Sequence, residues 1–181
     1  MIRSIVIALL LSIFVSPVAR AQDSKKLKPG DFFPEIKGKL LSSKMITLPD
    51  HCKGKVSVLI LAFKRGTQAQ IDTWTKPLMK EFSINNDFRY IEVPMISSFY
   101  NWLSHYIDNG MRSGIAKPMH QNVMTYYGSL NPYFDCFDVQ DKKLCYLFLL
   151  DKEGKIQFLT KGEAKPDELS VLLQKIKILL Q

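Results

Sequence analysis

The strongest constraint on the fold is an unbroken apolar run, VSVLILAF, at positions 56–63. Its only polar residue is Ser57, so the run has no polar side to expose to water. A run of this length is typical of a strand that is buried on both faces of a sheet. A sheet with such a strand needs a layer of helices or loops on each side. The run therefore predicts a layered α/β domain.

The rest of the chain supplies strands and helices in the alternation that this domain needs. In chain order, the predicted elements are a hairpin over 40–48, the strand 56–63, a helix over 67–82 kinked at Pro77, a strand over 88–93 ended by Pro94, an amphipathic helix over 99–107, a second helical piece over 118–128, a hairpin over 145–160 and a final helix from Pro166. This order predicts a three-layer α/β/α sandwich with a mixed central sheet.

Residues 1–21 have the features of a secretory signal peptide. Arg3 gives a basic start, an apolar stretch follows, and Ala19-Arg20-Ala21 resembles a cleavage signal. The stretch is shorter than the roughly 20 residues of an ordinary membrane span. We therefore expect a signal peptide at 1–21, a polar linker at 22–30 and one domain at 31–181, exported to the periplasm or the cell exterior. An uncleaved N-terminal anchor is the alternative.

The basic residues are spread along the chain. The net charge of +8 falls by two when residues 1–21 are removed, because two arginines leave with them. Dispersed lysines are typical of a solvated surface, so we predict no nucleic-acid partner. An exported basic protein is also attracted to anionic membranes, so peripheral membrane association is a second interpretation of the charge.

Short motifs around the apolar run resemble one known superfamily. They are Gly30-Asp31-Phe32-Phe33-Pro34, Gly54-Lys55 and the strand that ends at Phe63. Together they resemble the lead-in of secreted thioredoxin-like reductases and of peroxiredoxins, which implies a thioredoxin-like fold. The resemblance places the two redox cysteines of the reductases at Gln68 and Ile71, and neither is a cysteine here. The resemblance thus implies the scaffold without its usual thiol chemistry.

The chain has three cysteines, Cys52, Cys136 and Cys145. An odd number in an exported protein allows one internal bridge and leaves one thiol over. Cys136 and Cys145 flank a polar turn, so we predict a structural disulfide between them. The resemblance to the reductases also places Cys145 at the position of their cis-proline, if the register holds. A non-standard thiol-disulfide oxidoreductase or peroxiredoxin-like enzyme using Cys145 or Cys136 is therefore the main alternative function.

A copper metallochaperone is the third hypothesis, because soft sulfur and imidazole ligands suit Cu(I). The Cys-x-x-x-Cys-Pro motif of the copper chaperones that share this fold is absent, and methionines beside aromatic residues usually fill the core. We therefore predict no metal site and no cofactor. The ligand candidates weighed were Met111, Met119, His120, Met124 and the adjacent pair His51-Cys52.

Two groups of residues are candidates for binding a protein partner. The first is the start of the predicted helix, Thr67, Gln68 and Gln70, because a helix N-terminus and the groove beside it can hold an extended peptide. The second is an aromatic patch around Tyr126 and Tyr127, near Tyr133 and Phe134. The competing interpretations are an ordinary solvated first turn and a loop packed over the core.

The domain also resembles a divergent thioredoxin-like group, the mitochondrial ATPase assembly factor ten family. The matching segments are Gly54-Lys55-Val56-Ser57-Val58, the helix start at Gln68 and Gln70, His120, the block YLFLLDKEGKI at 146–156, and Gly162-Glu163-Ala164. That family lacks the Cys-x-x-Cys pair and is implicated in assembling the membrane sector of ATP synthase. The resemblance implies a redox-inactive chaperone or assembly factor that binds a protein partner at a membrane. The secretory-type N-terminus and the three cysteines depart from the family.

Overall fold

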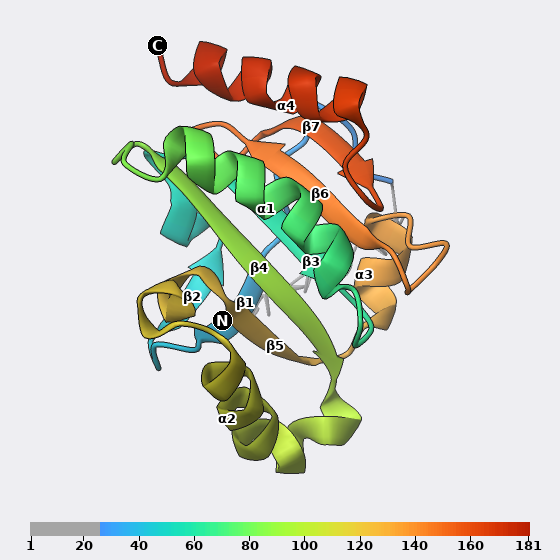
Figure 1. The fold of residues 1–181 in the computed structure, drawn as a ribbon. Helices are drawn as coiled ribbons and strands as arrows, with labels where there is room; N and C mark the ends of the chain where they lie inside the picture. The colour runs from blue at the N-terminus through green and yellow to red at the C-terminus, as the bar shows by residue number, and fades with distance from the viewer. Residues whose placement is uncertain (1–25) are drawn as a thin grey trace, which may run out of the picture.

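A seven-stranded mixed sheet forms the centre of the computed structural model, which describes residues 26–181 (Figure 1). The predicted signal peptide lies outside these residues, as does the first part of the linker. Neighbouring strands β3, β4 and β5 are parallel, and the other pairs are antiparallel. Across the sheet the strands are β2 (Met45–Leu48), β1 (Ile36–Leu40), β5 (Met124–Gly128), β4 (Phe88–Ser97), β3 (Val56–Ala62), β6 (Cys145–Leu150) and β7 (Ile156–Lys161).

Strand β3 lies between β4 and β6 and is buried on both faces, as its apolar run predicts. Successive side chains of a strand point to opposite faces. Val58 and Ile60 enter one core, and Leu59 and Leu61 enter the other. The sheet therefore separates two apolar layers, and both lie within the described residues.

Helices α1 (Gln68–Phe82) and α4 (Pro166–Leu179) cover one face of the sheet (Figure 1). The buried side of α1 includes Ile71, Trp74 and Leu78, which follow the three- and four-residue spacing of a helical stripe. Trp74 is fully buried, and its indole N–H donates to the Gly162 carbonyl oxygen at 2.8 Å. This bond ties α1 to the segment that leads into α4.

The opposite face is covered by the short helix α3 (Asn131–Cys136) and by the segment that precedes β1. Aromatic rings dominate this layer: Phe33 lies 5.3 Å from Phe148 and 5.5 Å from Phe137, measured between ring centroids. With helices on both faces of a mixed sheet, the predicted three-layer α/β/α class is confirmed. Within residues 26–181, none of the helices is both long and apolar enough to cross a bilayer.

The prediction that Pro94 ends a strand is wrong, because β4 runs through it to Ser97. A proline removes one backbone donor from a ladder. Pro94 faces Ala62, the last residue of β3, and from Met95 onward β4 pairs with β5 instead. The missing donor thus falls where β4 changes partners.

The predicted helical piece over 118–128 is also wrong in its second half. Residues Lys117–Asn122 form a 3-10 helix, η3, and the residues after Val123 form β5. Met124 faces one core while Thr125 and Tyr127 point to the other side, which is the alternation of a strand. Helix α2 (Ser104–Gly114) lies against Tyr127, on the side of the sheet that carries α1.

Candidate functional site

Helix α1 begins just beyond the end of β3, the place where thioredoxin-like enzymes hold their nucleophile. Thr67 precedes the helix but does not cap it, since its buried hydroxyl donates to the Lys64 carbonyl oxygen at 2.6 Å. The first helical residue, Gln68, is exposed, and Ile71 is buried in the core. The two positions of the redox pair therefore carry an exposed amide and a core side chain.

Gln70 joins α1 to the start of β6. Its Nε2 donates to the Lys143 carbonyl oxygen at 3.0 Å, and its Oε1 accepts from the backbone N–H of Cys145 at 3.1 Å. Both polar ends of this amide are thus used inside the chain. Gln70, predicted as a partner-binding residue, holds the start of β6 against α1 in the structure.

The thiol of Cys145 is buried. Its side chain is inaccessible, and the thiol donates to the Gly162 carbonyl oxygen at 3.1 Å. Burial raises the pKa of Cys145 to about 11, so the thiolate that nucleophilic chemistry requires is scarce at neutral pH. Burial also raises the pKa values of Cys52 and Cys136.

The structure does not contain the predicted disulfide between Cys136 and Cys145, since all three cysteines of the chain are free. Cys145 belongs to the core layer under α1 and α4, whereas Cys136 packs against the layer on the opposite face of the sheet. The sheet lies between the two sulfurs. Nearness in sequence across the turn therefore does not bring them together.

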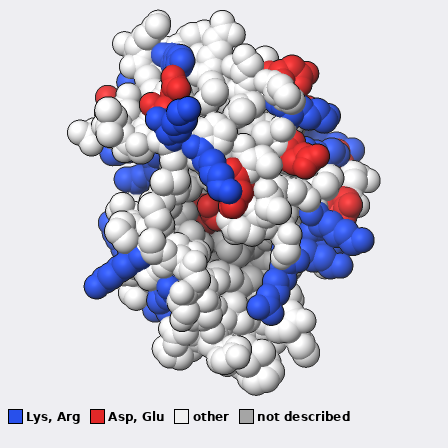
Figure 2. Space-filling view, viewed as in Figure 1, with Lys and Arg blue, Asp and Glu red and all other residues white. Residues whose placement is uncertain are grey.

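A cluster of polar side chains at the start of α1 was missed by the sequence analysis (Figure 2). The amide of Gln68 donates from Nε2 to Asp72 Oδ1 at 2.9 Å and also hydrogen-bonds Glu92 on β4. Burial raises the pKa of Glu92 to about 7, and the nearby charge of Asp72 adds to the rise. Figure 2 shows acidic side chains in the middle of the face that carries α1. The only sequence signal was a carboxylate inside the apolar strand Tyr90-Ile91-Glu92-Val93.

The groups of this cluster can accept hydrogen bonds from a molecule that lies beside them. Glu92 is only partly covered, and Gln68 is exposed. Carboxylate and amide oxygens accept hydrogen bonds from backbone N–H groups or from basic side chains. A charged carboxylate that is partly buried favours such a donor, because a hydrogen bond from the donor replaces the hydration that the carboxylate has lost. Gln68, Asp72 and Glu92 together are called the acidic cluster below.

The predicted patch around Tyr126 and Tyr127 does not form as one surface. The two residues are neighbours in β5, so their side chains point to opposite faces of the sheet. The Tyr126 ring packs 5.3 Å from that of Tyr133, and its hydroxyl donates to the Ser129 carbonyl oxygen. The Tyr127 hydroxyl donates to Asp108 Oδ1 of α2 at 2.8 Å. Both rings are partly buried, which agrees with the alternative of a segment packed over the core.

The candidate copper ligands do not converge. Met124 lies in one core layer and Met119 packs against the other, on opposite sides of the sheet. His120 Nε2 lies 2.9 Å from the Ile115 carbonyl oxygen, so this nitrogen carries a proton and is not free to bind a metal. In the part of the chain that the structure describes, no group of three or more His, Cys, Asp or Glu side chains is placed to hold a metal ion.

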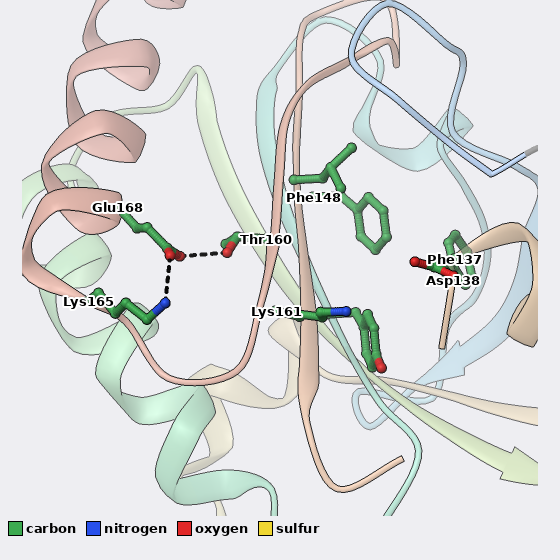
Figure 3. Close-up of a pocket in the computed structure, with 9 residues that line it drawn as sticks. Phe137, Asp138, Phe148, Thr160, Lys161, Lys165 and Glu168 are labelled. Atoms are coloured by element: carbon green, nitrogen blue, oxygen red, sulfur yellow. Dashed lines mark hydrogen bonds and ion pairs between the residues drawn. The ribbon is translucent and has the colours of Figure 1, made fainter. Parts of the chain in front are cut away.

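An open cavity of about 340 Å³ lies beside the edge strand β7 (Figure 3). Figure 3 shows Phe148 and Phe137 on one side of β7 and the polar group of Thr160, Lys165 and Glu168 on the other. Glu168 accepts from Thr160 at 2.6 Å and from Lys165 at 3.3 Å, so these polar groups satisfy one another. The lining residues are Phe137, Asp138, Tyr146, Phe148, Leu159, Thr160, Lys161, Lys165 and Glu168.

Solved structures with this architecture support the fold. A protein described as a disulfide isomerase from Bacteroides thetaiotaomicron has a TM-score of 0.62 at 20% identity, over 85% of this chain and 91% of that one. A protein described as the thiol:disulfide interchange protein DsbE from Chlorobium tepidum has a TM-score of 0.61 at 16% identity, over 86% and 100%. BsSco, a member of the Sco family of cytochrome c oxidase assembly proteins, has a TM-score of 0.59 at 15% identity, over 87% and 99%. At these identities the likeness shows a thioredoxin-like fold alone.

Sequence families give a more specific result. No curated protein sequence matches the chain significantly. The family model described as ATP10 protein matches residues 12–179, which is most of the chain and includes every strand and helix of the sheet domain. The resemblance to the assembly factor ten family is thereby confirmed, and the chain belongs to the ATP10 protein family.

Proposed function

We propose that this chain is a redox-inactive assembly factor that binds a protein partner at a membrane through the acidic cluster at the start of α1. Membership of an ATP synthase assembly-factor family supports an assembly role. The partner we infer is a subunit of the membrane sector of ATP synthase. We infer from residues 1–21 that the chain acts after export, in the periplasm or outside the cell.

One observation carries the proposal. Where a thioredoxin-like enzyme has its nucleophile, this chain has Gln68, and the nearby thiol of Cys145 is buried. Cys145 is inaccessible, its thiol donates a hydrogen bond to the Gly162 carbonyl oxygen, and burial raises the pKa of the thiol to about 11. A disulfide exchange enzyme needs an accessible thiolate. A binding role at the same position needs only groups that can pair with a partner.

The acidic cluster supports that binding role. Burial and the nearby charge of Asp72 raise the pKa of Glu92 to about 7. The folded chain is therefore less stable whenever the carboxyl group of Glu92 is charged. Strongly shifted groups of this kind are concentrated at functional sites. A backbone N–H group or a basic side chain of the partner would relieve the cost by donating to Glu92.

The test uses cells that lack this chain and measures the assembled membrane sector of ATP synthase on native gels. The full-length chain with Cys52→Ala, Cys136→Ser and Cys145→Ala together should restore assembly to the level of the wild-type chain. Glu92→Ala should restore much less, while Glu81→Ala on the exposed surface of α1 serves as the matched control. The proposal fails if the thiol-free chain accumulates normally and does not support assembly.

A further inference from the structure

Four aromatic side chains stand out in solvent on η2 (Ser98–Leu103) and on α2. The exposed fractions are 74% for Phe99, 45% for Tyr100, 76% for Trp102 and 78% for Tyr106. These four residues are called the aromatic ridge below. Figure 1 shows η2 and α2 projecting from one end of the molecule, beyond the sheet and away from α4. Large aromatic side chains are normally buried, so an exposed cluster marks a site of interaction.

The ridge is held outward by the packing of the segment beneath it. Asp108 of α2 is 7% exposed and accepts from the Tyr127 hydroxyl, which fixes the inner side of the helix to β5. Arg112 donates from Nε to the Leu41 carbonyl oxygen at 2.8 Å and anchors the end of α2. The aromatic side chains are therefore presented by a fixed support and do not fold back onto the core.

The segment that carries the ridge has no exposed acid. Residues 93–107 contain no Asp, Glu, Lys or Arg, and over residues 93–134 the sole carboxylate is the buried Asp108. The same span contributes exposed Lys117, and exposed Lys39 of β1 lies beside α2, whereas the half-buried Arg112 is paired with Asp108 at 4.0 Å. Figure 2 shows this lower lobe white, with blue at its margins and no red.

We propose that the aromatic ridge docks this chain on the surface of an anionic lipid bilayer. Trp and Tyr rings favour the boundary between headgroups and acyl chains, because one part of the ring is apolar and another is polar. The lysines at the margins are attracted to anionic headgroups, and no exposed carboxylate of residues 93–134 opposes that attraction. The inference goes beyond the proposed function, since the ridge is separate from the acidic cluster.

The shape of the ridge favours a bilayer over a peptide as its occupant. Protein sites that bind peptides or helices are grooves with pockets for anchoring side chains. The aromatic ridge, by contrast, consists of side chains that protrude from the surface and would insert into a partner. A bilayer interface accepts such side chains without a matching pocket.

The test measures binding of the chain lacking residues 1–21 to vesicles, because the apolar stretch in those residues would bind lipid by itself. The sheet and both core layers lie within residues 26–181, so the shortened chain keeps its fold. One vesicle preparation is phosphatidylcholine alone, and the other contains about one-third phosphatidylglycerol. Trp102 reports on docking, because the only other tryptophan, Trp74, is fully buried.

We expect the anionic vesicles to bind the chain, to shift its tryptophan emission to the blue and to protect it from acrylamide. The double variant Phe99→Ser/Trp102→Ser should lower the vesicle-bound fraction about tenfold or more, because both apolar anchors are lost. Ile84→Ser is the matched control: this side chain is 93% exposed, lies between α1 and β4, and should leave binding unchanged.

Three results would overturn the inference. The first is that the wild-type chain does not bind anionic vesicles, and the second is that the double variant binds them as well as the wild type does. The third is that the wild-type chain binds without any change in Trp102 emission. The last result would mean attraction by surface charge alone. Thermal unfolding of the double variant is the control for a folding defect. We expect its unfolding midpoint to match that of the wild type, since both substituted side chains are exposed.

Discussion

Replacing Glu92 by Gln should stabilise this protein, and the gain should depend on pH. Burial raises the pKa of Glu92 from 4.5 to about 7, the charge of Asp72 adds to the rise, and the hydrogen bond from Gln68 opposes it. Glutamine has nearly the same shape but does not ionise, so Glu92→Gln removes the cost of charging this site.

The size of the effect follows from linkage between protonation and folding. Each tenfold change in proton affinity corresponds to about 1.4 kcal/mol, so a rise from 4.5 to about 7 corresponds to about 3 kcal/mol. Below pH 4.5 both folded and unfolded chains hold the proton, and Glu92 costs nothing. As the pH rises to about 7, the unfolded chain releases the proton first, so the free energy of unfolding falls. Above pH 7 the full cost is present.

Urea unfolding of the wild type and of Glu92→Gln at about pH 5 and about pH 8 measures this difference. We expect a gain of about 2–3 kcal/mol at the higher pH and about 1 kcal/mol or less at the lower one. Glu81→Gln is the control, because this exposed carboxylate pairs with Lys177 at 2.8 Å and has a lowered pKa. Equal gains at both pH values, or no gain at the higher one, would refute the assignment of Glu92 as a partly buried carboxyl group whose charge costs stability.

The remaining predictions concern the thiols and two packing positions. In native protein without reductant, an alkylating reagent should leave Cys145 unmodified and react slowly with Cys136; rapid reaction of either below pH 7 would contradict the raised pKa values. Gln70→Leu should lower the free energy of unfolding by about 1–2 kcal/mol in urea, because the partly buried N–H of Cys145 and the exposed carbonyl oxygen of Lys143 lose their hydrogen bonds; no change would mean that water replaces both. Gly38→Ala should cost about 1–3 kcal/mol, because the added Cβ would lie 2.6 Å from the Thr125 carbonyl oxygen, and an unchanged unfolding midpoint would refute this close packing of β1 on β5.

The elements with a clear apolar pattern were predictable from sequence. The run that forms β3, the hairpin of β6 and β7, and the final helix from Pro166 were all predicted, because burial on two faces or on one helical stripe leaves a plain pattern. Strand β5 was not predicted, because it is short and follows Pro118 closely. Its place in the sheet is fixed by pairing with β1 and β4, which are distant in sequence.

For the candidate site, the sequence indicated only that the two redox cysteines of thioredoxin-like enzymes are missing. The resemblance to the reductases was enough to place Gln68 and Ile71 at the positions of their two redox cysteines. The raised pKa of Glu92 depends on α1 lying over β4, so no local pattern indicates it. The periodicity of Phe99, Trp102 and Tyr106 indicated a helix with an apolar side. It did not indicate that this side faces water, which the structure shows.

The central claim is that a partner docks at the start of α1 without a thiol. The most direct test places a photo-reactive amino acid at position 68 of the full-length chain in cells and identifies what it captures. We predict a covalent adduct with a membrane-sector subunit of ATP synthase that forms equally in the thiol-free chain, and no such adduct from exposed position 175 on α4. Capture that is the same from both positions, or that disappears when the cysteines are removed, would contradict the account.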